Sequence, residues 1–202
     1  LLAIDANAIV NRAYYGIRPL VTKSGEYTNG IYGFLNILYK LIEQRNPDYI
    51  VCAFDLKDKT FRHKLYEDYK AKRHAMPMEL VSQIPLLKEV LNALNIKYLE
   101  VSGYEADDIL GTLSNYCDQR DIDCDIATGD RDALSLVTKN TKVLLATTKQ
   151  TGSETIEYDE AAVFEKYKVK PKNLVDIKAI WGDASDNIPG VKGIGEKGAM
   201  EL

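Results

Sequence analysis

Acidic residues follow the apolar segments of this sequence that have the composition of buried strands. The three segments and their acids are 1–4 with Asp5, 49–54 with Asp55, and 123–128 with Asp130, the last after one glycine. The carboxyl ends of parallel strands meet at one edge of a sheet, which is where α/β proteins form their sites. We therefore expect these three carboxylates to lie close together.

Six further acids occur in three short segments, at 103–108, 128–132 and 182–187. Residues three positions apart on a helix share a face. Two pairs have this spacing, Glu105 with Asp108 and Asp183 with Asp186. The nine candidate metal-ligating and catalytic acids are Asp5, Asp55, Glu105, Asp107, Asp108, Asp130, Asp132, Asp183 and Asp186.

The chemistry of this set is that of oxygen ligands alone, because His63 and His74 both lie in a separate basic segment. An oxygen-only site suits a hard cation, Mg²⁺ or Mn²⁺, rather than zinc. So many carboxylates would repel one another severely without cations. Two divalent ions or more, roughly 4 Å apart, account for them in the arrangement used for phosphodiester hydrolysis.

Each acid also has a simpler interpretation. An aspartate after a strand is often a turn residue or a helix N-cap, and the segment from Glu105 to Asp108 would complement a helix dipole. Two features favour a shared site. The acids recur at the same end of successive strand–helix units, and the doublets have helix-compatible spacing.

Residues 57–73 interleave cations with aromatic rings and carry seven Lys or Arg against three acids, a local charge of +4. Phosphate attracts lysine and arginine, and unpaired bases stack on aromatic rings. Spacings of three or four predict one helical face, formed by Arg62, Tyr66, Tyr69, Lys70 and Arg73. The alternative is a solvated helix whose rings pack on the core, but the segment follows Asp55 and so lies at the rim of the expected site.

The whole chain has 202 residues and a net charge of −4, which alone argues against nucleic acid. Removing the nine acids from this charge leaves +5. The apolar runs are strand-sized, so no segment spans a bilayer. Three cysteines without a CxxC motif indicate reduced cytosolic thiols. The missing initial Met and the helical character of the last residues indicate a fragment.

The order of apolar and amphipathic segments predicts an α/β fold with a mostly parallel central sheet flanked by helices. Strands are predicted at 1–4, 49–54, 96–101, 123–128, 142–146 and 155–158. Helices are predicted at 30–44, 78–94, 104–120, 133–137, 159–167 and 171–181, with a polar turn at 147–153. In the glycine-rich tail Gly195 opens a helix, and the exposed N–H groups of such a terminus bind phosphate.

Several motifs, in order along essentially the whole chain, resemble those of the 5′ nuclease domains of bacterial DNA polymerases I, within the flap endonuclease family. They are LAID ending at Asp5, AFD at Asp55, FRH at His63, YKAKR at Arg73, GYEADD at Asp108, TGDRD at Asp132 and GDASDNIPGVKGIG at Gly195. The resemblance implies a PIN-like 5′ nuclease fold, with an α/β catalytic domain over 1–180 and a helical arch over 57–80. It also implies the start of a helix-three-turn-helix module over 181–202, which is truncated.

The resemblance divides the acids between two metal ions. The first group is Asp5, Asp55, Glu105, Asp107 and Asp108, and the second is Asp130, Asp132, Asp183 and Asp186. It places Lys70 and Arg73 at the scissile phosphate as catalytic candidates, with Arg62 supporting binding and Tyr69 offering a stacking surface. Further DNA-binding candidates are Gly190, Lys192, Gly193, Gly195 and Lys197, with a K⁺ ion at the glycine-rich hairpin.

The activity implied by the resemblance is that of a structure-specific, metal-dependent 5′-3′ exonuclease and flap endonuclease of replication and repair. Its expected substrates are DNA with a 5′ flap or a 5′ single-stranded end, and RNA primer–DNA hybrids. We also expect a monomer linked to a polymerase region, located in the bacterial cytoplasm at the nucleoid and without membrane contact.

Three residues depart from the family pattern: Ala6, where glycine is usual, Ala8, where a small polar residue is common, and Gly198, where threonine is usual. Three other functions remain open. One is a PIN-type metal-dependent ribonuclease, although simple PIN domains lack both the arch and the glycine-rich tail. The second is a DNA-binding module without catalysis, although all nine matching acids are present. The third is a phosphatase with an Asp-x-Asp nucleophile at Asp130 and Asp132, although it explains neither the other seven acids nor the arch.

Overall fold

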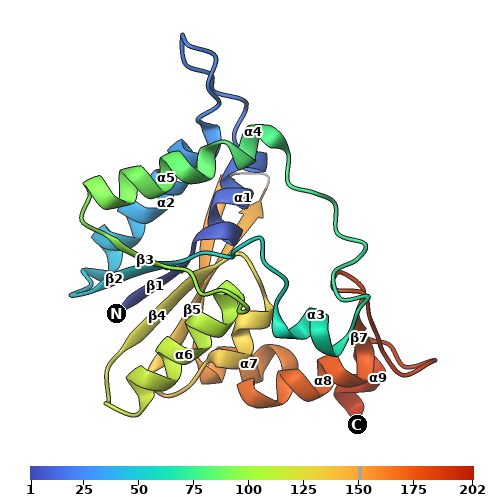
Figure 1. Ribbon diagram of the computed structural model, residues 1–202. Coiled ribbons are helices and arrows are strands. Elements are labelled where there is room, and N and C mark those ends of the chain that lie inside the picture. Colours follow the sequence, from blue (N-terminus) through green and yellow to red (C-terminus); the bar gives the residue numbers. More distant parts are fainter. Residues whose placement is uncertain (150–151) are drawn as a thin grey trace.

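A six-stranded sheet in the order β3-β2-β1-β4-β5-β6 forms the centre of the computed structural model, which describes residues 1–149 and 152–202 (Figure 1). Its strands are β1 (Leu2–Asp5), β2 (Ile50–Ala53), β3 (Lys97–Leu99), β4 (Cys124–Thr128), β5 (Thr141–Lys149) and β6 (Gly152–Tyr158). Neighbouring strands pair in parallel from β3 to β5, and β6 pairs antiparallel with β5. The prediction of a mostly parallel sheet is confirmed.

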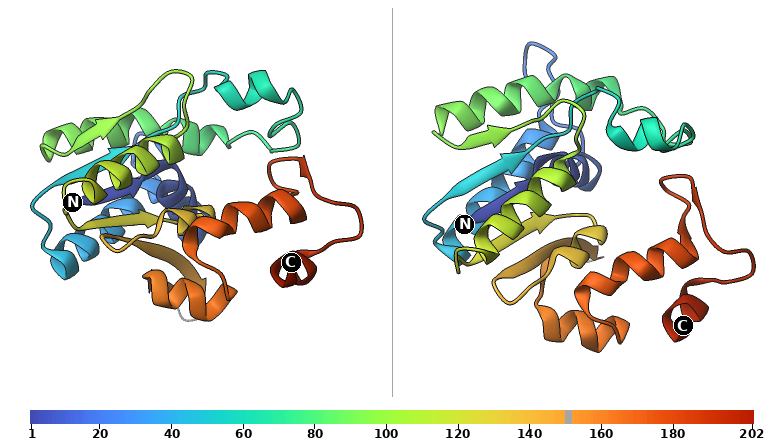
Figure 2. Two further views of the ribbon diagram at one scale, coloured as in Figure 1. Left: turned by 90° about the horizontal axis from the view of Figure 1, so that it is seen from below. Right: turned by 60° about the horizontal axis from the view of Figure 1, so that its bottom comes forward.

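Helices connect these strands and cover both faces of the sheet (Figures 1 and 2). They are α1 (Ala6–Gly16), α2 (Asn29–Arg45), α3 (Phe61–Leu65), α4 (Met78–Val81), α5 (Gln83–Ala93), α6 (Ala106–Asp118), α7 (Glu160–Tyr167), α8 (Leu174–Trp181) and α9 (Glu196–Glu201). Two 3₁₀ helices, η1 (Asp132–Leu136) and η2 (Pro171–Asn173), and a small pair of strands, β7 (Gly182–Asp183) and β8 (Ile188–Pro189), complete the fold. The polar turn predicted at 147–153 includes residues 150 and 151, which lie outside the described residues.

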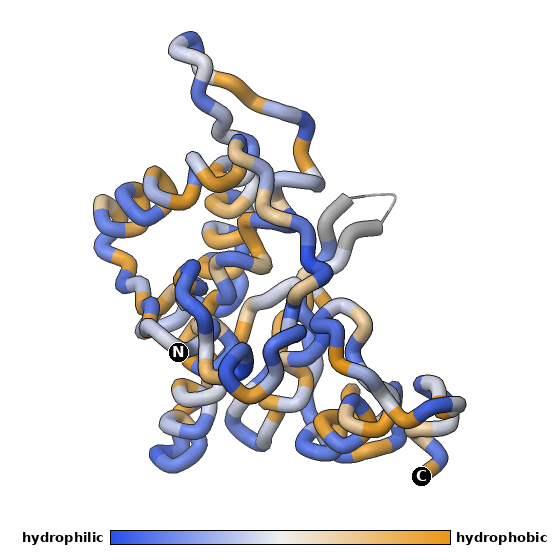
Figure 3. The backbone as a smooth tube through the Cα atoms, turned by 45° about the vertical axis from the view of Figure 1, so that its right-hand side comes forward, coloured by the Kyte–Doolittle hydropathy of each residue, from blue (hydrophilic) through white to orange (hydrophobic). Residues whose placement is uncertain are grey.

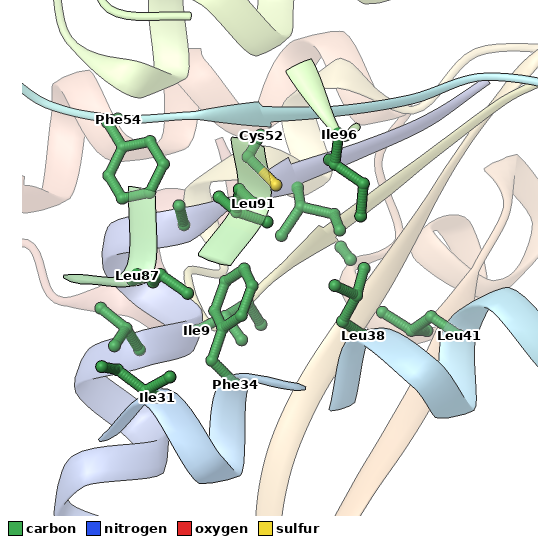
Figure 4. Packing of buried hydrophobic residues seen from close by; sticks show 14 of the residues in the cluster. Ile9, Ile31, Phe34, Leu38, Leu41, Cys52, Phe54, Leu87, Leu91 and Ile96 are labelled. Carbon is green, nitrogen blue, oxygen red and sulfur yellow. The ribbon is translucent and has the colours of Figure 1, made fainter. Parts of the chain in front are cut away.

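Side chains of β1 alternate between two hydrophobic clusters, as the period of a strand requires. Leu2 and Ile4 belong to a cluster with α1, α2 and α5, whereas Ala3 belongs to a cluster with α6 and η1. Figure 4 shows the first cluster, where Phe34 of α2 lies near Leu87 of α5. Full burial of each such Leu or Phe contributes about 1.5–3 kcal/mol. The strands are therefore held between two helical layers, which fixes the position of their carboxyl ends.

Helix α1 begins directly after β1, in a segment for which no element is predicted. Its buried residues Ile9, Val10 and Ala13 have the spacing of one helical face. Asp5 is the N-cap, because its Oδ1 accepts a hydrogen bond from the backbone N–H of Ala8 at 2.9 Å. The first candidate metal ligand is thus positioned by a strand and a helix together.

Segment 57–80 contains less helix than predicted. α3 ends at Leu65, and hydrogen-bonded turns follow it, with Lys70 in the left-handed region at φ 57°. The expected common helical face over 62–73 is therefore wrong. Pro85 lies in the first turn of α5, where its missing N–H does no harm, but in one continuous helix it would remove a hydrogen bond. The predicted helix 78–94 is accordingly divided into α4 and α5.

The C-terminal part of the chain turns back tightly after α8. A Cβ on Gly190 would lie 2.0 Å from the carbonyl oxygen of Trp181, so only glycine allows the two backbones to approach this closely. Gly182 pairs with Pro189 in the β7–β8 ladder and has φ 86°. Figure 2 shows this turn and α8 lying opposite α3 and the segment that follows it. Two opposite sides of the expected site are therefore formed by segments that lie far apart in the sequence.

Residues 17–28, between α1 and α2, form a loop that projects away from the sheet in Figure 1 and lies at the top of the tube in Figure 3. Backbone hydrogen bonds between Thr22 and Glu26 and between Leu20 and Thr28 close this loop. Within residues 1–149 and 152–202, the structure contains no helix with the length and apolar character needed to cross a membrane.

Candidate active site

The nine acids line two adjoining clefts, of about 930 and 980 Å³. Those that line the first are Asp5, Asp55, Glu105, Asp107, Asp130, Asp132 and Asp186. Asp108 and Asp183 line the second, which also includes four acids of the first. The structure thus brings all nine acids to one region, at the carboxyl ends of the neighbouring strands β2, β1 and β4.

Asp5 is the most enclosed of these acids, with 5% of its surface exposed. Its Oδ2 accepts a hydrogen bond from Thr128 Oγ1 at 2.7 Å, in addition to the N–H of Ala8 on Oδ1. Burial, together with the smaller effect of the nearby charges of Asp55 and Asp130, raises the pKa of Asp5 to about 6 even though these hydrogen bonds lower it. A carboxylate in this position gains strongly from a cation.

Asp107, in the first turn of α6, lies in the same environment. Burial raises its pKa to about 7, and the next largest causes are the negative charges of Asp5, Asp130 and Asp55. Lys70 lowers this pKa only in part. The two raised pKa values have the same physical origin, which is the crowding of negative charge into a site with little water.

Asp55 and Asp108 support the start of α6 as well as the cleft. Asp55 Oδ1 accepts from the N–H of Ala106 at 2.7 Å, and Asp108 Oδ2 accepts from the N–H of Glu105 at 2.9 Å. Glu105 and Asp108 form a capping box at this helix terminus. These acids therefore cap the start of α6, as the simpler interpretation predicts, and they also line the clefts.

Cationic side chains of segment 57–73 lie directly on the acids of the first group. Arg62 forms two hydrogen bonds with Asp108, at 2.7 and 2.8 Å. Burial would raise the pKa of Asp108, but these bonds hold it below its usual value. Lys70 Nζ donates to Glu105 Oε1 at 2.8 Å. The segment is thus fixed to the start of α6 by ion pairs.

Tyr69 does not present the open stacking surface that the resemblance implies. It is 6% exposed, and its hydroxyl donates to Glu105 Oε2 at 3.0 Å. Burial, and after it the adjacent carboxylate of Glu105, raises the pKa of Tyr69. Its role in this conformation is to anchor the segment to Glu105. Phe61 and Tyr104, whose ring centroids are 5.8 Å apart, are exposed instead.

The doublet Asp183 and Asp186 lies on a turn, so the helical geometry expected from its spacing is wrong. Asp183 Oδ1 accepts hydrogen bonds from the N–H and the Oγ of Ser185, at 2.9 and 2.6 Å, and from the N–H of Asp186 at 3.3 Å. A side chain that binds its own following backbone favours a turn over a helix. Asp186 in turn forms an ion pair with Arg73.

Lys178 of α8 connects the two parts of the second acidic group. Its Nζ lies 2.6 Å from Asp132 Oδ1 and 2.7 Å from Asp183 Oδ2. Burial raises the pKa of Asp183, but the hydrogen bonds from Lys178 and Ser185 outweigh it and bring the value to about 2. Lys178 was not among the residues that the sequence singles out, because a lone lysine in an amphipathic helix is usually solvated.

Other residues beside the acids also escape prediction from the sequence. Thr128 and Asn7 position acids, since Asn7 Oδ1 accepts from the N–H of Asp55 at 3.1 Å. Arg12 and Arg131 line the first cleft as well. The only sequence signal for these polar residues is their closeness to the acids along the chain, and it does not separate them from ordinary turn residues.

Among the described residues 187–202, which include most of the glycine-rich tail, none lines the first cleft. Gly193 has φ 88°, Gly195 is the N-cap of α9 as predicted, and Lys192 and Lys197 are exposed. Gly190 has a structural reason to be glycine, as the close approach to Trp181 shows. Contact of these residues with DNA, and the K⁺ site, stay predictions.

The three departures from the family pattern leave the acids in place. Ala6 is fully buried and directly follows Asp5, Ala8 supplies the N–H that Asp5 accepts, and Gly198 lies inside α9. These three positions therefore remove none of the nine candidate carboxylates.

The donor chemistry of the clefts fits a divalent cation, because every candidate ligand is a carboxylate and several are destabilised by mutual repulsion. In residues 1–149 and 152–202, no three Asp, Glu, His or Cys side chains already surround one point as the ligands of an ion do. Lys70, Arg73 and Lys178 occupy positions on the carboxylates instead. These cations supply part of the charge that the acids require.

Two family models together match the chain. That described as the 5′-3′ exonuclease N-terminal resolvase-like domain matches residues 1–168, and that described as the 5′-3′ exonuclease C-terminal SAM fold matches residues 169–202. DNA polymerase I of Caldicellulosiruptor bescii is 46% identical over 204 residues, which cover 100% of this chain and 24% of that protein. The 5′-3′ exonuclease of Bacillus subtilis is 42% identical over 207 residues, 100% of this chain and 69% of that protein. This chain thus spans about a quarter of the DNA polymerase I relatives.

Solved structures share the fold. T5 5′-exonuclease with bound zinc superimposes with a TM-score of 0.76 at 22% identity, covering 100% of this chain and 73% of that one. A T5 flap endonuclease variant in a complex with DNA and metal ions has a TM-score of 0.73 at 20% identity, covering 99% and 72%. These matches confirm the parallel-sheet fold that the motifs imply. Given the family model that covers residues 1–168, the chain belongs to the 5′-3′ exonuclease family.

Proposed function

We propose that this chain is a divalent-metal-dependent 5′-3′ exonuclease and flap endonuclease that hydrolyses phosphodiester bonds. One observation carries the proposal: nine carboxylates line two adjoining clefts at the carboxyl ends of parallel strands, beside a cationic segment. The 5′-3′ exonuclease of Bacillus subtilis, 42% identical over 69% of its length, supports the same activity.

The carboxylates would hold two Mg²⁺ or Mn²⁺ ions. Asp5, Asp55, Glu105, Asp107 and Asp108 form the first group of ligands, direct or through water, and Asp130, Asp132, Asp183 and Asp186 form the second. Bound ions in this arrangement lower the pKa of a water and stabilise the charge on the phosphate and the leaving oxygen. No covalent protein nucleophile is required.

The protein's own cations provide further stabilisation of the phosphate. Lys70 and Arg73 lie on a turn above Glu105 and Asp186, and both reach into the first cleft. When they are not paired with these carboxylates, the two side chains would donate to the scissile phosphate, where developing negative charge strengthens the contact. Arg62 keeps its bidentate pair with Asp108 and holds the segment in place.

The substrates proposed are DNA with a 5′ flap or a 5′ single-stranded end and RNA primer–DNA hybrids, in replication and repair. The exposed rings of Phe61 and Tyr104 are suited to stack against unpaired bases at the cleft rim. The glycine-rich tail would contact duplex phosphate through Lys192, Lys197 and the N–H groups near Gly193 and Gly195, with Gly190 shaping the turn and a K⁺ ion on backbone carbonyls. We propose a monomer that continues into a polymerase region.

A labelled 5′-flap duplex tests this function. With Mg²⁺ the protein should release the flap with a new 3′-hydroxyl and leave a 5′-phosphate on the strand that remains in the duplex. Release should not occur in EDTA or with the Asp107→Asn variant. Cleavage that persists in EDTA would contradict the metal mechanism. Tight binding without cleavage would indicate a DNA-binding module, and preferential cutting of single-stranded RNA without a free 5′ end would indicate a PIN-type ribonuclease.

A further inference from the structure

Lys178 occupies a distinctive place among the charged residues of the clefts. It lies on α8, between Asp132 of η1 and Asp183 of β7. Its Nζ lies 2.6–2.9 Å from oxygens of the Asp132 carboxylate and of the Asp183 carboxylate. Asp132 falls in the part of the chain matched by the N-terminal family model, whereas Lys178 and Asp183 fall in the C-terminal one. One ammonium group thus connects two segments of the fold, each of which contributes a negatively charged aspartate.

We infer that Lys178 is an internal counter-ion of the second acidic group, which holds Asp132 and Asp183 together in the metal-free protein and must withdraw before a divalent ion binds there. The inference rests on the proposed function, because it assumes that these two acids are metal ligands.

The geometry favours exchange of the lysine for an ion at Asp183 without rearrangement of that carboxylate. Asp183 Oδ1 is held by Ser185 independently of Lys178, which contacts Oδ2 only. Asp130, next to Asp132, is fixed in turn because its Oδ1 accepts the N–H of Asp132 at 2.9 Å. When the lysine leaves, the carboxylates of Asp183 and Asp130 therefore keep these hydrogen bonds.

Lys178 is also able to leave. Its side chain is 36% exposed, and a lysine carries its charge on a flexible four-carbon stem that water solvates strongly. The ammonium and a divalent ion compete for the same oxygens and repel each other, so the lysine weakens ion binding at the second group. Its function is to set the affinity of that group and to prevent the repulsion between the two acids when no ion is bound.

The first test is a Mn²⁺ titration without DNA, followed by the electron paramagnetic resonance signal of free Mn²⁺. Lys178→Met should bind the more weakly held of the two Mn²⁺ ions at least about tenfold more tightly than the wild type does, because a repelling unit charge is removed. Lys178→Arg, which keeps the charge, should not show this gain. Lys139→Met is the matched control, since Lys139 pairs with Asp121 at 3.0 Å on the surface, and its affinity should equal that of the wild type.

A second test uses the unaltered protein and does not depend on the folding of a variant. Acylation of lysines by an amine-reactive ester, read by mass spectrometry, should label Lys178 several-fold faster with Mn²⁺ than with EDTA, while the rate at Lys139 stays constant. Unchanged labelling of Lys178, or unchanged or weaker Mn²⁺ binding by Lys178→Met, would overturn the inference. Absence of any Mn²⁺ binding by the wild type would instead overturn the proposed function.

Discussion

Lys70 donates a hydrogen bond from Nζ to Oε1 of Glu105 over 2.8 Å. The contact joins a cation proposed to meet phosphate with a carboxylate proposed to meet a metal ion. The backbone of Lys70 is also fixed, because its N–H donates to the carbonyl oxygen of Asp186 at 2.9 Å while its φ is 57°. A left-handed non-glycine residue is strained by about 1–3 kcal/mol, and such strain concentrates at functional sites. The turn is therefore held between the start of α6 and the acidic turn after α8.

Replacement of Lys70 by alanine should slow the chemical step. We expect the single-turnover rate of release of the 5′-terminal nucleotide from a single-stranded end to fall about 10²–10³-fold, because a donor to the developing charge is lost. Lys64→Ala, an exposed lysine of α3, is the matched control and should react at the wild-type rate. An unchanged rate for Lys70→Ala would remove Lys70 from the mechanism.

The Arg62–Asp108 pair should stabilise the base of segment 57–80. Arg62→Gln leaves a partly buried carboxylate without its bidentate partner, so the free energy of unfolding in urea should fall by roughly 1–3 kcal/mol. In a double-mutant cycle with Asp108→Asn, the coupling energy should be roughly 1–2 kcal/mol. Additive losses from the two substitutions would show that the pair contributes nothing beyond its separate side chains.

Asp107→Asn should stabilise the metal-free protein in a pH-dependent way. The folded-state pKa of Asp107 is about 7, above its ordinary value of 3.8, so the folded state binds the proton more tightly than the unfolded state. The wild type therefore loses stability as the pH rises from about 4 through 7, and the variant does not share this loss. In EDTA its advantage should grow over that range to an upper limit of roughly 4 kcal/mol and then stay constant.

Urea denaturation in EDTA at pH 4.5, 6 and 8 measures this advantage. With saturating Mn²⁺ at pH 8 the order should reverse, because the wild type gains the binding energy of the ion and the variant has lost a ligand. An advantage of Asp107→Asn that does not depend on pH would mean that crowded negative charge is not its cause.

Two glycines of the tail should respond differently to alanine. A Cβ at Gly190 would lie 2.0 Å from the Trp181 carbonyl oxygen, so Gly190→Ala should destabilise the protein by roughly 1–3 kcal/mol. A Cβ at Gly195 meets no atom within 4 Å, so Gly195→Ala should keep the wild-type stability to within about 1 kcal/mol. Thermal unfolding and 5′-flap binding of both variants separate a packing role from a DNA contact. Equal stability of the two variants would contradict the packing role of Gly190.

The sheet and its acidic edge are predictable from the sequence because buried strands require apolar residues, and these are visible in the sequence. Strands such as 49–54 are continuous apolar runs, as strands covered on both faces must be. Parallel pairing then places the following acids, Asp5, Asp55 and Asp130, at one edge. Helix α1 has an equally clear pattern in Ile9 and Val10 and could have been predicted by the same reasoning.

The conformations of segments 61–73 and 183–187 are not predictable in this way, because contacts between distant residues decide them. The spacing of Arg62 to Arg73 fits a helix, but the chain beyond Leu65 follows its attachments to Glu105 and Asp186. Tyr69 is buried for the same reason. The bridge made by Lys178 likewise depends on α8 lying beside η1, which no local pattern encodes.

Diffraction from crystals of the protein grown with Mn²⁺, measured for anomalous scattering, tests the central claim most directly. We predict two anomalous peaks, one among Asp5, Asp55 and Asp107 and one beside Asp132 and Asp183, each within about 2.0–2.3 Å of carboxylate or water oxygens. Lys178 should lie away from Asp183 in these crystals. Clefts without Mn²⁺ at saturating concentration, with the acids still paired to lysine and arginine, would contradict the account.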